Sequence, residues 1–389
     1  MRRRTLLATA GTLLTAGCGG LQSGSRGSGG RGAHVDGLIN NTNESEFDFS
    51  DAIEDRNFSM GDVNDVEFEF NESKFAADFE SKAGGAREES GTPMETDPRA
   101  TELMQEAMTG IQKAYEAYVS QAGSDATLMD VGITLDSFNA LRVRRLAKEA
   151  RTPLEEATEY APEGQKQVVL ALVQVTIFLE DLARVRRALI DAYDDFVYAV
   201  ERLYAESTTR ARYTVSSIRE YRKSAKQMFR PLKREIDEGA MAVFTPVGSV
   251  YDDKIDQIEA ELDGLRWGAE GVMEMAKALE KWPGAVEAYL DRDYERAVNR
   301  LDTAAFGFSY ARSDFERIDQ ESGMTDLTGE IARVAGTLET TADALGRSAS
   351  AKVEDDPQRK FFEAQRAAER AVNGDEIVSE MRTANRIIT

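Results

Sequence analysis

The sequence predicts an all-α fold: an antiparallel bundle of long helices with coiled-coil-like seams, preceded by a largely disordered N-terminal stalk. Between residues 98 and 389, apolar residues recur at helical spacing, and no run combines strand alternation with flanking turn residues. Several stretches keep a period of 3.5 residues, which packs one helix along another at a shallow angle. The residues before 98 are instead rich in glycine, serine and charge, a composition that cannot build a core.

The N-terminus has the composition of an export signal. Three arginines are followed by a weakly apolar stretch of about 10 residues, half of the roughly 20 that a transmembrane helix needs. Small residues precede Cys18, the single cysteine, and this arrangement resembles the lipobox of lipoproteins. Arg3-Arg4-Thr5-Leu6-Leu7 resembles a twin-arginine signal. The resemblance implies an export signal over residues 1–17 and a lipid on Cys18. That lipid would hold the protein at the outer face of the cytoplasmic membrane, the cell surface.

The charge balance narrows the class of protein further. Seventy acidic and 48 basic residues give a net charge of −22, and lysine supplies only 13 of the 48. With the export signal, this composition resembles the exported lipoproteins of halophilic archaea, which implies that the acidity is an adaptation to salt. In molar salt the Debye length is about 3 Å, so the self-repulsion is screened. Capture of a cationic partner is the alternative interpretation. We expect no nucleic-acid partner, because phosphate contacts need a dominant basic surface.

The counts of cysteine and histidine exclude several kinds of chemistry. With Cys18 lipidated, no thiol remains for a disulfide, a nucleophile or a thiolate metal site. The only histidine, His34, lies in a Gly/Ser-rich stretch, whereas catalytic and metal-binding imidazoles are held in packed sites. We therefore expect no enzyme, no metal and no cofactor. A hydrolase with paired carboxylates is the alternative, because it needs only two suitably placed acids.

Residues 18–97 are predicted to form the lipid-anchored stalk. Residues 19–33 contain seven glycines, and residues 44–80 carry 13 acids against two basic residues, with seven phenylalanines interleaved. That phenylalanine density also fits a segment laid on the main domain. Four Asn-x-Ser/Thr sequons occur here, at Asn40, Asn43, Asn57 and Asn71. They are candidates for N-glycosylation on an exposed stalk, and the alternative is an accident of composition.

Helix boundaries follow from capping residues, proline and glycine. Asp97-Pro98 is an N-cap followed by proline, which starts the helical domain 98–389, and Thr152-Pro153 with Glu155 predicts another start. Further breaks or turns are expected near Arg230, over 239–248, and at Pro283-Gly284, Gly323 and Asp356-Pro357. These boundaries give about seven to nine helices. They form either one bundle or two stacked sub-bundles with a break near 239–250.

Three seams predict the longest helices. The strongest is a period-3.5 series made of Ile255, Ile258, Leu262, Leu265, Ala269, Val272, Ala276 and Leu279. The second predicts one helix over 163–206, about 65 Å long at 1.5 Å per residue. The third runs from Leu327 to Leu345. Residues 285–305 resemble part of a tetratricopeptide repeat, but no second copy follows, so we expect a helical hairpin there.

Arg186 is the candidate polar site of the second seam. It lies in line with Leu182 and Leu189 on the stripe that should be buried. Because burying an unpaired ion costs several kcal/mol, Arg186 should either pair with a carboxylate or face a water-filled gap. The first outcome would be a polar core contact, and the second would be a candidate site for an anionic ligand.

One segment is strongly basic, unlike the rest of the chain. Residues 208–234 carry nine cations against Glu220 alone. This segment would contact an anionic lipid or polymer, or it would pair with acids such as those of residues 252–263.

Together these patterns favour a cell-surface lipoprotein that acts as a structural or protein-interaction module through its helix faces. The alternative is a small-molecule-binding sensor or a transport-associated helical bundle.

Overall fold

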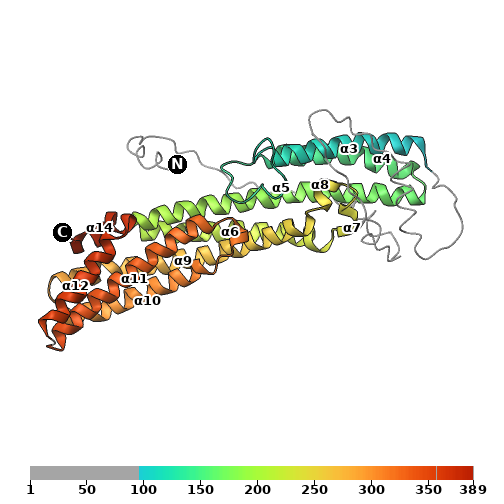
Figure 1. Ribbon diagram of the computed structural model, residues 1–389. Helices are drawn as coiled ribbons and strands as arrows, with labels where there is room; N and C mark the ends of the chain where they lie inside the picture. Colours follow the sequence, from blue (N-terminus) through green and yellow to red (C-terminus); the bar gives the residue numbers. More distant parts are fainter. Residues whose placement is uncertain (1–95, 356, 389) are drawn as a thin grey trace, which may run out of the picture. The chain divides into compact units, whose positions relative to one another are not determined.

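The computed structural model describes residues 96–355 and 357–388, all of which belong to one compact unit. Every regular element in these ranges is a helix, which confirms the all-α fold (Figure 1). Eight helices are long: α3 (Pro98–Val119), α4 (Ala140–Tyr160), α5 (Glu163–Tyr204), α6 (Thr208–Arg234), α9 (Tyr251–Leu290), α10 (Tyr294–Glu316), α11 (Thr325–Val353) and α12 (Gln358–Asn373). The short ones are α7 (Glu238–Met241), α8 (Thr245–Gly248), α13 (Glu376–Glu380), α14 (Arg382–Ile388) and the 3₁₀ turn η2 (Gln320–Ser322). The predicted export signal and nearly all of the predicted stalk lie outside the described residues.

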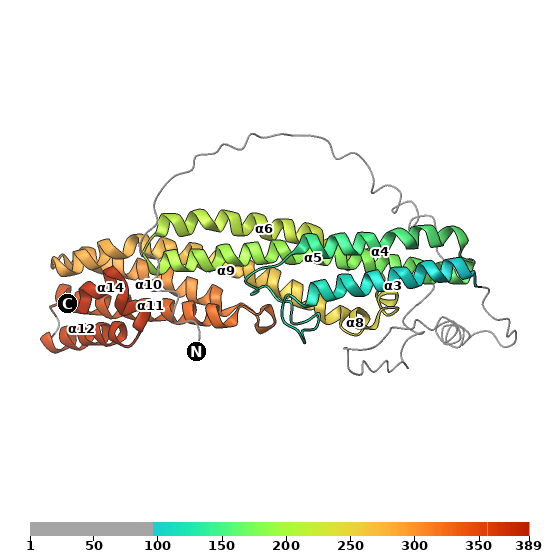
Figure 2. The ribbon, with the colours of Figure 1, turned by 90° about the horizontal axis from the view of Figure 1, so that it is seen from above.

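The two longest helices, α5 with 42 residues and α9 with 40, organise the packing. Helix α6 packs against both of them, while α3 and α4 pack together with α4 on α5 (Figures 1 and 2). Helix α10 lies between α9 and α11, and α12 packs on α11. Short connections join α5 to α6, α9 to α10 and α10 to α11, so these neighbours run antiparallel.

The predicted seams form the core. All eight residues of the 255–279 seam are buried in α9. Helix α5 ends within two residues of its predicted boundary. In α11, the seam is buried from Ile331 to Leu345, while Leu327 at its start is half-buried. The start of α3 is also confirmed, because Asp97 Oδ1 accepts hydrogen bonds from the backbone N–H groups of Arg99 at 2.8 Å and Ala100 at 3.1 Å.

Two predicted boundaries are wrong, and the reason is the same for both. Pro153 lies inside α4 and Pro283 lies inside α9. Proline removes one backbone hydrogen bond, but each of these helices buries apolar residues on both sides of it, Ala150 and Leu154 in one case, Trp282 and Val286 in the other. Burial of the flanking residues keeps each helix continuous.

The other predicted breaks lie close to the helix ends that the structure shows. Helix α6 continues through Pro231 and ends within one turn, at Arg234. The turn expected over 239–248 contains the single-turn helices α7 and α8. Gly323, with a φ of 67°, ends η2, and Pro357 is the N-cap of α12.

Candidate functional site

Arg186 of α5 pairs with Glu261 of α9 inside the core. Its Nη1 donates to both carboxylate oxygens of Glu261 at 2.7 Å, and the two side chains are 0% and 1% exposed. Glu261 Oε1 also accepts a hydrogen bond from the backbone N–H of Ile133 at 3.1 Å. Burial alone would lower the pKa of Arg186, but the interactions with Glu261 and Tyr118 together outweigh it and raise that pKa above its ordinary value. Arg186 therefore makes the polar core contact, the first of the two roles that its register allowed.

Lys254, about two turns before Glu261 on α9, extends this buried network. Its Nζ donates to the carbonyl oxygens of Leu128 at 2.7 Å and Val131 at 2.8 Å, and to Gln257 Oε1 at 2.8 Å. Burial, and then repulsion from Arg186, holds the pKa of Lys254 well below its ordinary value. The network thus fastens the α3–α4 loop onto α9 and fixes α9 against α5.

A second charged cluster surrounds Glu180 of α5, and sequence reasoning did not find it. The Glu180 side chain is 6% exposed, and four cations approach its carboxylate: Arg184 at 2.8 Å, Arg151 at 3.1 Å, Lys148 at 3.6 Å and Arg144 at 3.7 Å. Three of them lie on one face of α4, at spacings of four and three residues. That spacing was the available signal, but it equally describes a solvated helix face.

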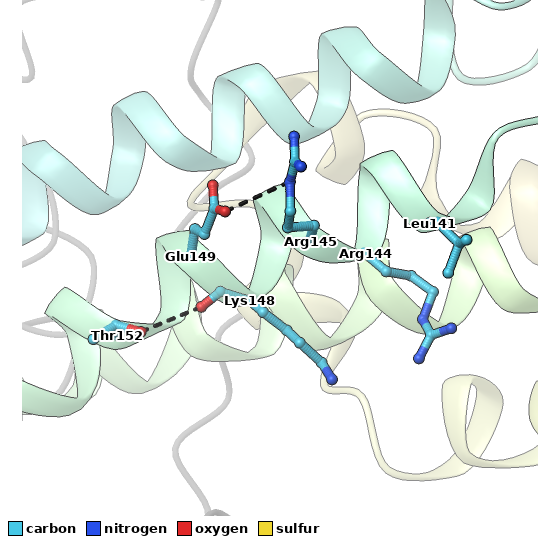
Figure 3. Close-up of a pocket in the computed structure, with 6 residues that line it drawn as sticks. All are labelled: Leu141, Arg144, Arg145, Lys148, Glu149 and Thr152. Carbon is cyan, nitrogen blue, oxygen red and sulfur yellow. Dashed lines mark hydrogen bonds and ion pairs between the residues drawn. The ribbon is translucent and has the colours of Figure 1, made fainter.

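A surface hollow of about 400 Å³ lies beside this cluster on α4. It is lined by Leu141, Arg144, Arg145, Lys148, Glu149 and Thr152. Figure 3 shows Arg144 and Lys148 extending to one side of α4, and Arg145 paired with Glu149 on another side. Because one carboxylate serves several cations, the hollow carries excess positive charge and can accept an anion.

The basic segment 208–234 forms α6, and its cations divide into two groups. Three pair with acids of α9: Arg212 with Glu280 at 3.0 Å, Arg222 with Asp263 at 3.5 Å and Lys233 with Glu259 at 2.7 Å. Two of these acids belong to the stretch 252–263 that the sequence indicated. Six others are exposed and form no ion pair with another described residue: Arg210, Arg219, Lys223, Lys226, Arg230 and Arg234. Pairing with α9 therefore accounts for only part of the positive charge.

An aromatic pair on α10 is the third surface feature, and it too was missed from the sequence. Phe306 and Tyr310 are 67% and 64% exposed, although α10 buries Phe308 and Phe315 against its neighbours. Residues four apart lie on the same face of a helix, so the two rings form one patch. The patch belongs to the side of α10 that faces neither α9 nor α11.

Several predicted sites lie outside the described residues, namely Cys18, Asn40, Asn43, Asn57 and Asn71. Among the residues that the structure describes, no group of histidine, cysteine and acidic side chains is arranged to hold a metal ion. Within the same ranges, no helix combines the length and apolar character that a membrane span requires.

Comparison with known proteins gives no relative. Neither a family model, nor a curated protein, nor a solved structure matches this chain.

Proposed function

We propose that the chain is a lipid-anchored protein of the cell surface whose helical domain serves as a structural or protein-interaction module. Support for the anchor comes from the twin-arginine-like start and from Cys18 with its small preceding residues. In this proposal a stalk over residues 18–97, glycosylated at Asn40, Asn43, Asn57 and Asn71, separates the helices from the membrane. The role is non-enzymatic and requires no cofactor and no nucleic acid.

The observation that carries the interaction module is the exposed pair of Phe306 and Tyr310. Large aromatic side chains are enriched in the cores of protein interfaces, where they account for much of the binding energy. Here two of them lie one turn apart on a free helix face and are about two-thirds exposed. A partner helix laid along α10 would cover both rings.

Photo-crosslinking in intact cells tests this interface. A photoreactive phenylalanine analogue placed at position 306 should give a discrete crosslinked species with another protein. The same analogue at position 213, where Tyr213 is 79% exposed on α6, is the matched control and should not give that species. Tyr310→Ala should weaken the crosslink from position 306 while changing the free energy of unfolding by no more than about 0.5 kcal/mol. Equal crosslinking from both positions would contradict the proposal.

The second candidate, a small-molecule-binding bundle, is favoured by the hollow on α4. Its Arg144 and Lys148 make only long contacts with Glu180, of 3.7 and 3.6 Å, so their donors can bind an incoming carboxylate. Succinate should then raise the melting temperature more than sodium chloride of equal ionic strength does. Arg144→Gln/Lys148→Gln should remove that difference, whereas Arg142→Gln on the same helix should keep it. Equal melting temperatures in the two salts would exclude this candidate.

A further inference from the structure

The second half of α6 borders a groove that is larger than the hollow on α4. The groove encloses about 560 Å³ between α6 and α9. Its α6 side presents Lys226, Arg230, Lys233 and Arg234, and the nearly buried side chains of Phe229 and Leu262 also line it. The groove therefore combines an apolar floor with a cationic rim.

The charge of this rim is not balanced by the acids beside it. Glu259 and Asp263, the two acids that line the groove, are engaged by Lys233 at 2.7 Å and by Arg222 at 3.5 Å. Lys226, Arg230 and Arg234 form no ion pair with any other described residue. An occupant that carries several acids and some apolar side chains would complement both parts of the groove.

The chain itself contains a segment of that chemistry. Residues 65–80 carry six acids against Lys74 alone, together with four phenylalanines. Over Val66, Phe68 and Phe70 the apolar residues alternate with acids, so one side of an extended segment can cover the floor while its acids meet the rim. Asn71 has the opposite parity to Phe68 and Phe70, so a glycan at that sequon would point away from the floor.

The tether is long enough to bring the segment to the groove. The backbone N–H of Asp97 donates to Gln165 at 3.0 Å, and that of Asp237 donates to Gln174 at 2.9 Å. These two contacts lie nine residues apart on α5, about 14 Å, and the four residues from Arg230 to the end of α6 at Arg234 add about 6 Å. The 16 residues from 81 to 96 span about 22 Å as a flexible coil, and more when extended. A tethered segment at this distance has an effective concentration in the millimolar range.

We propose that residues 65–80 occupy the groove between α6 and α9, with their acids on Lys226, Arg230 and Arg234 and a phenylalanine over Phe229 and Leu262. The acidic segment then neutralises the exposed half of α6 and fixes the last part of the predicted stalk to the helical domain. This inference does not rest on the lipid anchor or on the aromatic pair of α10.

Distance measurement between two spin labels in the full chain tests the proposal. In a Cys18→Ser background, Asn71→Cys and Gln227→Cys carry the labels, because Gln227 is exposed on α6 and is not a groove residue. The docked segment should give one narrow distance distribution. Lys226→Glu/Arg230→Glu should broaden it, and the matched control Arg210→Glu/Arg219→Glu, on the first half of α6, should leave it narrow. Circular dichroism should show the same helix content in all variants.

A charge-swapped variant distinguishes docking from a general effect on folding. Adding Glu67→Lys/Glu69→Lys to Lys226→Glu/Arg230→Glu should restore the narrow distribution. A broad distribution in the parent chain would overturn the proposal, as would a narrow one that survives Lys226→Glu/Arg230→Glu. Co-sedimentation with phosphatidylglycerol vesicles identifies the rival occupant: vesicle binding that requires Lys226 and Arg230, with a broad parent distribution, would assign the groove to the membrane.

Discussion

Arg186 shows how one side chain fixes the packing of the two longest helices. Its guanidinium and the carboxylate of Glu261 are both buried, so each is the main compensation for the desolvation of the other. Effective desolvation penalties of several kcal/mol per ion make such a pair sensitive to the loss of either partner. The pair therefore holds one register of α5 against α9, because a slip along either helix would separate the charges.

Arg186→Leu should lower the free energy of unfolding by about 3–5 kcal/mol, because it leaves Glu261 buried and unpaired. Guanidinium chloride unfolding followed by circular dichroism measures this. Arg186→Leu/Glu261→Leu should recover most of the loss, since the unpaired charge is then absent. Arg187→Leu is the matched control: its side chain is half-exposed, and its pair with Asp191 should be worth no more than about 1 kcal/mol. A single Arg186→Leu variant as stable as the parent would refute the buried pair.

Asp375, at the N-terminus of α13, gives a prediction about pH. Its Oδ1 accepts from the backbone N–H groups of Ile377 and Val378, and its Oδ2 accepts from Arg333 and Thr337. Burial alone would raise the pKa of Asp375, but the hydrogen bonds from Arg333 and from the backbone outweigh it and lower the pKa below 3.8. A lowered folded-state pKa gives stability that is complete above the unfolded-state pKa and is lost as the pH falls through the folded-state pKa.

Asp375→Asn should therefore destabilise the protein at pH 7, and the difference from the parent should shrink between pH 4 and pH 2. Denaturant unfolding at pH 7, 4 and 2 measures the two stabilities. Asp343→Asn is the control, because the pair of Asp343 with Arg347 is exposed at both ends, and this variant should match the parent at each pH. A constant difference between Asp375→Asn and the parent would contradict the role of the ionised carboxylate.

At the scale of helices, small residues set the distance between neighbours. A Cβ built on Gly307 of α10 would lie 2.8 Å from the Cβ of Ala278 on α9, closer than two carbon atoms pack. Gly329, which is exposed on α11, has open space where its Cβ would stand. The two glycines thus differ in packing although both lie inside helices.

Gly307→Ala should destabilise the protein by about 1–3 kcal/mol, because overpacking outweighs the gain in helix propensity. Gly329→Ala should be neutral or stabilising by up to about 1 kcal/mol, the propensity gain alone. Thermal unfolding of both variants compares them directly. If both substitutions stabilise the protein, α9 and α10 do not approach each other this closely.

The helix lengths and boundaries could be predicted from the sequence only in part. The period of apolar residues predicted the length of α5 and the buried face of α9, because a buried stripe repeats over consecutive turns of one helix. Pro153 and Pro283 were misinterpreted as boundaries, because their local cost is outweighed by burial against helices that lie far away in sequence. The single-turn helices α7 and α8 are too short to carry a period.

The candidate sites, too, could be predicted only in part from the sequence. The register of α5 placed Arg186 on the buried face, but it could not select Glu261 among the many acids of α9, because only the crossing of the two helices decides which one is opposite. The three cations of α4 around Glu180 were missed for a related reason. Their spacing on α4 is that of an ordinary solvated face until the structure places α5 beneath them.

In the whole molecule, the described helices form one domain, and the N-terminal sequence is the basis of its proposed location at the cell surface. In the proposed function, the exposed pair of Phe306 and Tyr310 is the surface of this domain that contacts a partner at the cell surface. Those contacts require that the domain be held there, and Cys18 is the residue proposed to hold it.

Intact-mass and fractionation analysis of the native protein, compared with Cys18→Ser, tests the proposed lipid anchor. We expect a mature chain that begins at Cys18, carries lipid mass and sediments with membranes. We also expect a Cys18→Ser variant that is released or left unprocessed. A native chain that retains Met1, carries no lipid and leaves the membrane as readily as Cys18→Ser would contradict the proposed anchor.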